Sequence, residues 1–175
     1  MADQQKDARA SRIESLIDKY GDDVLRVCYV YTKDYSAAQD LFQEVFIKVY
    51  NKLDSFRGES NEKTWIIQIA INTCKDYLKS AWIKRIVSFE FNEENEASSN
   101  TERSVIENIE KQEIMKSVLK LSSKLREVIL LYYYFGYSSS EIAKITGVTE
   151  SAVRSRLMRA REDLKQFLEE GGRSI

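Results

Sequence analysis

The chain has 175 residues, 43% hydrophobic and 31% charged, so it is not disordered as a whole and can form one domain or two small ones. It contains no proline and only six glycines, which favours an all-α fold. Its net charge of −1 argues against a polycation that coats nucleic acid, although this average can conceal segregated charge.

The histidine and cysteine content limits the catalytic, metal-binding and redox roles that the chain can have. The chain has no histidine, the commonest general base and metal ligand, so we expect neither an enzyme nor a cofactor or metal. Cys28 and Cys74 are expected as small core residues in a reducing compartment, with a redox switch as the alternative. The N-terminus lacks the apolar core of a signal peptide, and no run of about 18 apolar residues occurs. The sequence therefore predicts a cytoplasmic protein without membrane insertion.

The first half of the chain predicts three consecutive helices, over residues 11–32, 36–53 and 64–80. Polar residues 33–35 separate the first two helices, and Ser36 with Gln39 has the spacing of a capping box. Residues 55–63 contain Gly58 and predict a loop before the third helix.

An acidic segment then interrupts the helical pattern. Residues 89–102 contain no lysine or arginine, and they contain Glu90, Glu93, Glu94, Glu96 and Glu102. We interpret residues 89–106 as a flexible linker between a domain at 1–88 and a domain at 107–175. A surface loop within a single domain is the alternative.

The second half predicts a helix-turn-helix. The helical pattern resumes near residue 105, and Ser138 with Glu141 forms a second capping-box pattern. Gly147 breaks the chain before a last helix that starts near Thr149. A short helix, a turn with glycine and a second helix make up this motif.

Two helices in the first half have unusual outer faces. Opposite the apolar stripe of residues 36–53 lie Asp40, Gln43, Ile47 and Asn51, with Glu44 at the side, which is typical of a protein-docking surface. Single exposed apolar residues are common, however.

In the third helix, Trp65 and Ile69 lie off the apolar stripe beside Asn72, Asp76 and Lys79. This pattern favours binding to a single nucleic-acid strand, unless Trp65 packs under the preceding loop.

The last helix divides into an apolar face and an outer face. At about 100° per residue, Val153, Leu157, Ala160, Leu164, Phe167 and Leu168 share the packed side. Opposite them lie Ser151, Ser155, Met158, Arg159 and Glu162, while Arg154, Arg156 and Arg161 flank the stripe. The pattern indicates a recognition helix that reads the DNA major groove. Alternatively, the flanking arginines pair with Glu150, Glu162 and Asp163.

The chain contains four motifs in the order DLFQE…F, FRGES, TW…IA.N and V.SRL.RAR. Together they resemble the extracytoplasmic-function (ECF) group of bacterial RNA polymerase sigma factors. The segment AAQDLFQEVFIKVYNKLDSFRGESNEKTWIIQIAINTCKDYL resembles region 2 of that family. The segment LREVILLYYYFGYSSSEIAKITGVTESAVRSRLMRAREDL resembles region 4. The resemblance implies a subunit that binds core polymerase, recognises the −35 and −10 promoter elements and promotes strand opening.

The resemblance also implies residue roles. Asp40, Gln43, Glu44 and Ile47 would dock on core polymerase, which contributes its largest and second-largest subunits. The −10 element would meet Phe56, Arg57, Gly58, Glu59, Ser60, Asn61, Lys63, Trp65, Asn72, Lys75 and Lys79, with Asn72 as a wedge beside the opened base pair. The −35 element would meet Ser151, Arg154, Ser155, Met158 and Arg159. Relatives are usually held inactive by an anti-sigma factor, often anchored in the membrane, which implies such a partner here.

The chain departs from its relatives at two places. Asn61 and Glu62 stand where many relatives have an aromatic or basic residue, which alters the expected −10 pocket. Met158 stands where others often have histidine or phenylalanine, so the −35 sequence does not carry over. Two alternatives stay open: a free-standing helix-turn-helix regulator that binds duplex DNA without polymerase, and a helical scaffold that sequesters a partner.

Overall fold

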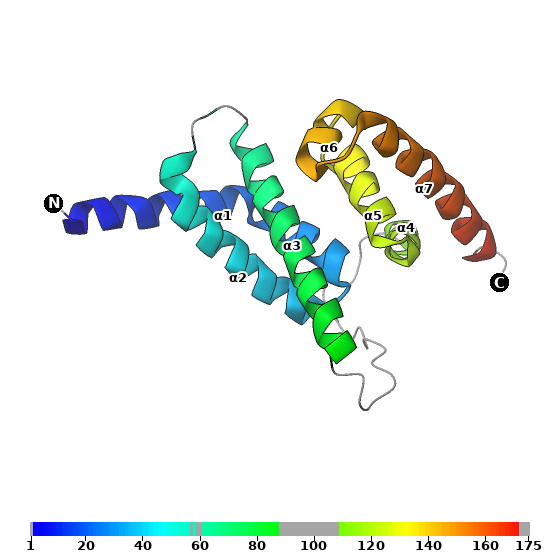
Figure 1. Cartoon of the computed structure of the whole chain (residues 1–175), viewed down its shortest axis with the longest axis horizontal. Helices are drawn as coiled ribbons and strands as arrows, with labels where there is room; N and C mark the ends of the chain where they lie inside the picture. Colours follow the sequence, from blue (N-terminus) through cyan, green and yellow to red (C-terminus); the bar gives the residue numbers. More distant parts are fainter. Residues whose placement is uncertain (1, 57, 59–60, 88–108, 172–175) are drawn as a thin grey trace. The chain divides into compact units, whose positions relative to one another are not determined.

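The computed structural model describes residues 2–56, 58, 61–87 and 109–171, and all regular structure within them is helical. This confirms the predicted all-α class. The chain divides into two compact units, Met1–Ala97 and Ser98–Ile175 (Figure 1). The predicted linker at 89–106 lies outside the described residues, so the domain boundaries stay predictions. Across the described ranges, no helix combines the length and apolar content needed to cross a membrane.

Three helices that pack against one another build the N-terminal unit. They are α1 (Ala2–Thr32), α2 (Tyr35–Lys52) and α3 (Glu62–Val87), and a single 3-10 turn, η1 (Leu53–Ser55), follows α2 (Figure 1). Their apolar stripes meet in a core that includes Leu16, Val24, Val27, Leu41, Val45, Val49, Ile66, Ile67, Ala70 and Ile71. Each stripe repeats at helical spacing, so burial of the stripes brings the three helices together.

All three N-terminal helices start before their predicted first residues, and α1 starts at Ala2 rather than at residue 11. The predicted capping box of Ser36 and Gln39 is wrong, because Asp34 is the N-cap of α2 and its carboxylate accepts a hydrogen bond from the Ala37 N–H at 2.7 Å. An aspartate oxygen satisfies this free N–H as well as serine would. Helix α3 begins at Glu62, two residues before the predicted start, because the Asn61 Oδ1 accepts from the Lys63 N–H at 2.9 Å.

Cys28 and Cys74 lie in the core of this unit, on α1 and α3, as free buried thiols. This burial confirms the prediction that both are core residues. The pKa of the Cys74 thiol is raised, first by its hydrogen bond with Cys28 and then by burial away from water. A raised pKa keeps a thiol protonated and slow to react.

The C-terminal unit consists of α4 (Ile109–Lys120), α5 (Ser123–Ile129), η2 (Leu130–Tyr134), α6 (Ser139–Thr146) and α7 (Glu150–Gly171). The segment η2 is a π-helical turn that continues directly from α5. Helix α7 contacts α4, α5 and α6, and it is the red helix of Figure 1. The shared core includes Leu121, Leu125, Val128, Leu131, Ile142, Ile145, Val153, Leu157 and Ala160.

The turn chemistry of the helix-turn-helix follows the prediction. The capping box is confirmed: the Ser138 N–H donates to Glu141 at 2.8 Å, and the Ser138 hydroxyl accepts from the Glu141 N–H at 3.3 Å. The Ser138 hydroxyl also donates to the Glu141 carboxylate at 2.7 Å, and this bond, followed by the bond from the Ser138 N–H, holds the pKa of the Glu141 carboxyl below its ordinary value. Gly147 ends α6 with φ of 72°, in the left-handed region that glycine adopts without strain. The Thr149 hydroxyl then caps α7.

Candidate protein and nucleic-acid interfaces

The outer face of α2 is as exposed as its sequence pattern predicts. Asp40, Gln43 and Glu44 are exposed, and 60% of the surface of Ile47 is open to solvent. The carboxylate of Glu44 lies 2.7 Å from the Lys48 ammonium, one turn further along the helix. The α2 face therefore presents one large apolar side chain surrounded by polar groups, which is the usual anatomy of a docking surface.

Trp65 is half-buried against Phe56, which also belongs to the predicted −10 site. Its ring lies 4.8 Å from the ring of Phe56, centroid to centroid, with the planes inclined by 37°. Of the two interpretations of Trp65, the structure favours packing under the loop, although part of the ring stays accessible. Within the same predicted site, Gly58 is exposed with φ of 71°, while Arg57, Glu59 and Ser60 lie outside the described residues.

Three predicted −10 residues form a row along α3. Trp65, Asn72 and Lys79 follow one another at intervals of two turns, so they share one side of the helix. Asn72 and Lys79 are exposed and Lys75 is half-buried. The prediction that Ile69 lies on this outer face is wrong: only 7% of Ile69 is exposed, because it packs into the three-helix core.

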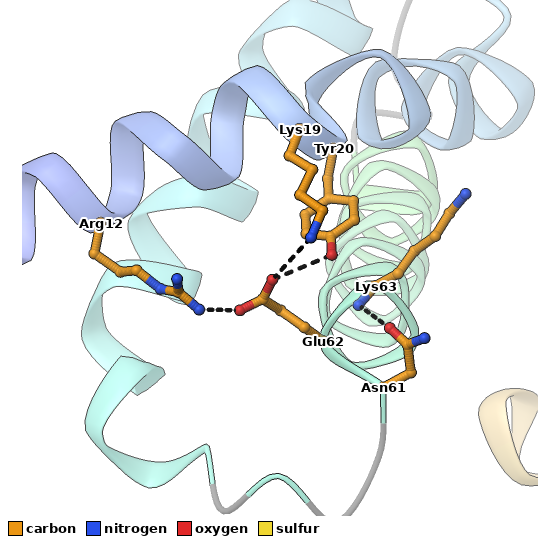
Figure 2. A network of polar contacts seen from close by, with 6 residues as sticks. All are labelled: Arg12, Lys19, Tyr20, Asn61, Glu62 and Lys63. Atoms are coloured by element: carbon orange, nitrogen blue, oxygen red, sulfur yellow. Dashed lines mark hydrogen bonds and ion pairs between the residues drawn. The ribbon is translucent and has the colours of Figure 1, made fainter.

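Helix α1 contacts the start of α3 through a polar network, which Figure 2 shows. The Glu62 carboxylate pairs with Arg12, accepts a hydrogen bond from the Tyr20 hydroxyl at 3.1 Å, and lies 3.9 Å from the Lys19 ammonium. Tyr20 also raises the pKa of Lys19 through a hydrogen bond, with a smaller contribution from the charge of Glu62. Three groups of one helix therefore converge on the first residue of another.

Two further contacts connect α1 to the same region. The ammonium of Lys63, a predicted −10 residue, lies 2.8 Å from the Asp23 carboxylate. Before the loop, Arg9 donates to the Asp54 carboxylate at 2.9 Å and to the Tyr50 carbonyl at 2.5 Å. Sequence reasoning missed these contacts, since each joins residues about 40 positions apart and leaves no local pattern.

The outer face of α7 agrees with the predicted division of that helix, but the placement of Leu168 on the packed side is wrong, because 43% of Leu168 is exposed. Val153, Leu157 and Ala160 are buried, whereas the predicted −35 residues are exposed: Ser151, Arg154, Ser155, Met158 and Arg159. Arg154 lies 2.5 Å from the Glu150 carboxylate, so one of the predicted flanking ion pairs is confirmed. Met158 is 59% exposed and occupies the centre of this face.

Arg161 contacts a tyrosine rather than the predicted acidic residues. Its Nε donates to the Tyr133 hydroxyl at 2.8 Å, and this bond raises the pKa of Arg161. The guanidinium also lies 5.6 Å from the Tyr132 ring, within cation–π distance. Beside it is a groove of about 500 Å³, lined by Tyr133, Arg161, Leu164, Lys165, Leu168 and Glu169. No sequence pattern predicted this groove, because its apolar residues also fit the packed stripe of α7.

The described part of the chain contains no candidate metal-binding site. Nowhere in that part do three or more cysteine, aspartate or glutamate side chains come together in a way that could hold a metal ion. The exposed faces of α2, α3 and α7 are suited to binding other macromolecules.

Comparison with known proteins identifies the class to which this fold belongs. Residues 16–83 match the family Sigma-70 region 2, and residues 111–164 match Sigma-70, region 4. The chain is 32% identical to RNA polymerase sigma factor YlaC of Bacillus subtilis, over 88% of this chain and 90% of that protein. It is 38% identical to the ECF RNA polymerase sigma-E factor of Escherichia coli K12, over 70% of this chain and 69% of that protein.

Solved structures have the same fold. The sigma factor RpoE of Bartonella quintana, in complex with the anti-sigma factor NepR, is similar with a TM-score of 0.74 and 24% identity, over 89% of this chain and 96% of that one. CnrH, in complex with the cytosolic domain of CnrY, is similar with a TM-score of 0.62 and 20% identity, over 90% of this chain and 88% of that one. The chain therefore belongs to the ECF group of the sigma-70 family of RNA polymerase sigma factors.

Proposed function

We propose that this chain is a promoter-specificity subunit that binds core RNA polymerase, recognises the −35 and −10 elements and opens the DNA at the second. The observation that carries the proposal is the presence of both sigma-70 regions in one chain, in the family order. A protein of this kind acts by binding and not by catalysis. We place it in the cytoplasm, where its polymerase works.

The α2 face supports polymerase docking. Asp40, Gln43 and Glu44 supply negative and amide groups around the exposed Ile47. An apolar centre that becomes dry on binding, with a polar rim that selects the partner, gives both affinity and orientation. We propose that this face contacts the largest subunit and that the complete subunit also meets the second-largest.

The row on α3 supports recognition of the −10 element as an opened strand. Trp65 offers an aromatic surface to a base, Asn72 an amide, and Lys75 and Lys79 positive charge to phosphates. Extrusion of a base costs a few kcal/mol in lost stacking and pairing, so these contacts must compensate for it. Lys63 contributes to DNA binding only if it leaves Asp23, with which it is paired in the free protein.

The exposed face of α7 supports recognition of the −35 element in duplex DNA. Arg159 can donate two hydrogen bonds to a guanine edge, and the short side chain of Ser155 permits close approach to the groove. Met158 between them suits contact with a thymine methyl group. Arg154 lies at the edge of this face and is paired with Glu150. It would contact the phosphate backbone after this ion pair opens.

The likeness to sigma factors in complex with anti-sigma factors supports a further partner. The solved structures with this fold were obtained as complexes with NepR and with the cytosolic domain of CnrY. We propose that an anti-sigma factor also binds this chain and keeps it from polymerase, and that this partner is anchored in the membrane.

Runoff transcription tests the proposed function. Core polymerase is incubated with genomic fragments in the presence and absence of the full chain, and we expect transcripts that start at defined sites only when the chain is present. No such transcript from any fragment would overturn the proposal. Tight, specific binding of duplex DNA without polymerase would instead support a free-standing regulator, because a sigma subunit alone neutralises few phosphates.

Replacement of Asn72 by alanine tests the role of α3. We expect roughly tenfold slower formation of the open complex, since the lost amide contacts compensate for part of the unpairing cost. The affinity for core polymerase should not change. Both quantities are measured with the reconstituted holoenzyme, and Gln166→Ala on α7 serves as an exposed amide control. Equal loss of opening and of core binding would contradict the wedge role.

A further inference from the structure

The polar contacts of α1 lie on both sides of the loop that precedes α3. Arg9 contacts Tyr50 and Asp54 before residue 56, and Arg12 and Tyr20 contact Glu62 after residue 61. Figure 2 shows the second group, in which Arg12 and Tyr20 reach the Glu62 carboxylate from one helix. We name Arg12, Lys19, Tyr20 and Glu62 the Glu62 clamp.

The Glu62 clamp differs from an ordinary surface ion pair. The Glu62 side chain is only 20% exposed, and its two oxygens face three donors of α1. The neighbouring Asp23–Lys63 pair is also partly covered, with the Asp23 side chain 16% exposed. Isolated exposed pairs contribute little, whereas several donors that share one acceptor restrict geometry at a site partly shielded from water.

Because Glu62 lies at the start of α3, the Glu62 clamp restrains the beginning of this helix. Glu62 is the first residue of α3, and Asn61 immediately before it caps that helix through the Lys63 N–H. Trp65 follows in the first turn, and Asn72 lies two turns further on the same side. Because a helix is stiff over this length, a tether at its first residue acts together with the core packing of α3 to set the position of the whole row.

We propose that Glu62 is a positioning residue for recognition of the −10 element. Through Arg12 and Tyr20 it holds the first turn of α3 so that Asn61, Trp65 and Asn72 meet the opened strand in one arrangement. This inference rests on the proposed function and adds to it a determinant of base preference that itself need not touch DNA. It also gives a structural role to the acidic residue that stands here in place of the aromatic or basic residue of many relatives.

A purely structural role for Glu62 predicts a different result. If the clamp only stabilised the unit, its loss would lower transcription by the same factor from every promoter. The three-helix core is extensive without it, because Ile66, Ile67 and Ile71 of α3 are fully buried. A positioning role predicts instead that transcription from promoters with different −10 sequences changes by different factors.

The experiment uses the full chain reconstituted with core polymerase and a promoter series in which each −10 base is varied. Glu62→Ala should change the ratio of transcripts between the preferred and the substituted −10 sequences by roughly three- to tenfold. Glu62→Gln, which keeps an oxygen for Tyr20, should change it less. The matched control is Glu14→Ala, an exposed carboxylate on the same helix as Arg12.

A double-mutant cycle connects Glu62 to its partner. Arg12→Ala should shift the base preference in the same direction as Glu62→Ala, and the double variant should shift it no further. An unchanged preference in Glu62→Ala, or additive effects in the cycle, would overturn the inference. So would an equal loss from all promoters together with a lower melting temperature. If the wild-type chain yields no promoter-dependent transcript, the proposed function itself fails.

Discussion

The two units hold their candidate DNA-binding residues in different ways. In the N-terminal unit, long-range polar contacts from α1 reach Glu62 and Lys63 at the start of α3. In the C-terminal unit, the exposed residues of α7 depend on the buried stripe beneath them, and the ion pair of Arg154 with Glu150 is local. Both helices are held by buried apolar stripes, and the start of α3 is held in addition by polar partners from another helix.

The difference suits the two forms of DNA that we propose for these units. A DNA duplex has a regular major groove, and the walls of this groove orient a helix that fits into it. A single strand has no such shape, and the protein must supply the arrangement in which bases stack and amides meet their edges. A more elaborate set of contacts around α3 than around α7 is therefore expected.

The largest expected effect comes from weakening the core of the C-terminal unit. Leu131 is fully buried in the C-terminal core, so Leu131→Ala should lower the free energy of unfolding of that unit by about 2–5 kcal/mol. Hydrogen exchange of the full chain measures each unit separately. Exchange in α1, α2 and α3 should be unchanged, and an equal loss of protection in both units would contradict their independence.

Replacement of Arg159 tests whether the exposed face of α7 recognises duplex DNA. Arg159→Ala should cost about 1–3 kcal/mol on promoters that depend on the −35 element, because a bidentate contact with guanine is lost. Holoenzyme binding to duplex promoters measures the effect, and the affinity for a single-stranded −10 oligonucleotide should stay the same. Lys165→Ala, an exposed cation further along α7, is the control. A similar loss with both variants would indicate a general effect of charge.

Replacement of Ile47 separates polymerase binding from both DNA contacts. Ile47→Glu places a charge at the centre of the α2 face and should weaken core polymerase binding about tenfold, or about 1.4 kcal/mol. The affinity is measured by competition with the wild-type chain. Because Ile47 is 60% exposed, the melting temperature should not fall. A loss of stability with unchanged affinity would show that Ile47 is not at the interface.

The smallest expected effect concerns the capping box of α6. The folded-state pKa of Glu141 lies below its ordinary value of 4.5, so its hydrogen bonds stabilise the fold above that pH and are lost as the pH falls through the folded pKa. Glu141→Gln should flatten this part of the pH profile of unfolding, measured by circular dichroism of the full chain. Ser138→Ala should reduce the same pH-dependent contribution, because the hydroxyl contact is lost while the Ser138 N–H remains, and an unaltered profile in both variants would contradict the role of the box.

Much of the fold could be predicted because its signals are local. The apolar repeat of α7, the Ser138–Glu141 box and the left-handed Gly147 each depend on residues within a few positions. The exposure of Ile47 and Arg159 followed from the same periodicity. Ile69 was misplaced because a helical wheel assumes one packed face, whereas α3 contacts both α1 and α2 and buries a wider arc.

The polar contacts around α3 could not be predicted from the sequence. Nothing in the sequence marks the exposed Arg12 or the buried Tyr20 as partners of Glu62, which lies 50 and 42 positions away from them. Only the packing angle of α1 against α3 decides which charges meet. The same applies to Arg161, whose partner is the Tyr133 hydroxyl rather than an acidic neighbour on its own helix.

The burial of Cys28 and Cys74 makes the molecule convenient for spectroscopy. Both native thiols lie inside the first unit, so a probe that reacts with sulfhydryl groups will leave them unmodified while the fold is intact. A cysteine introduced at Ser80 on α3 and another at Glu170 on α7 would then carry a donor and an acceptor dye. Energy transfer between them would follow the separation of the two units as the holoenzyme engages and melts a promoter.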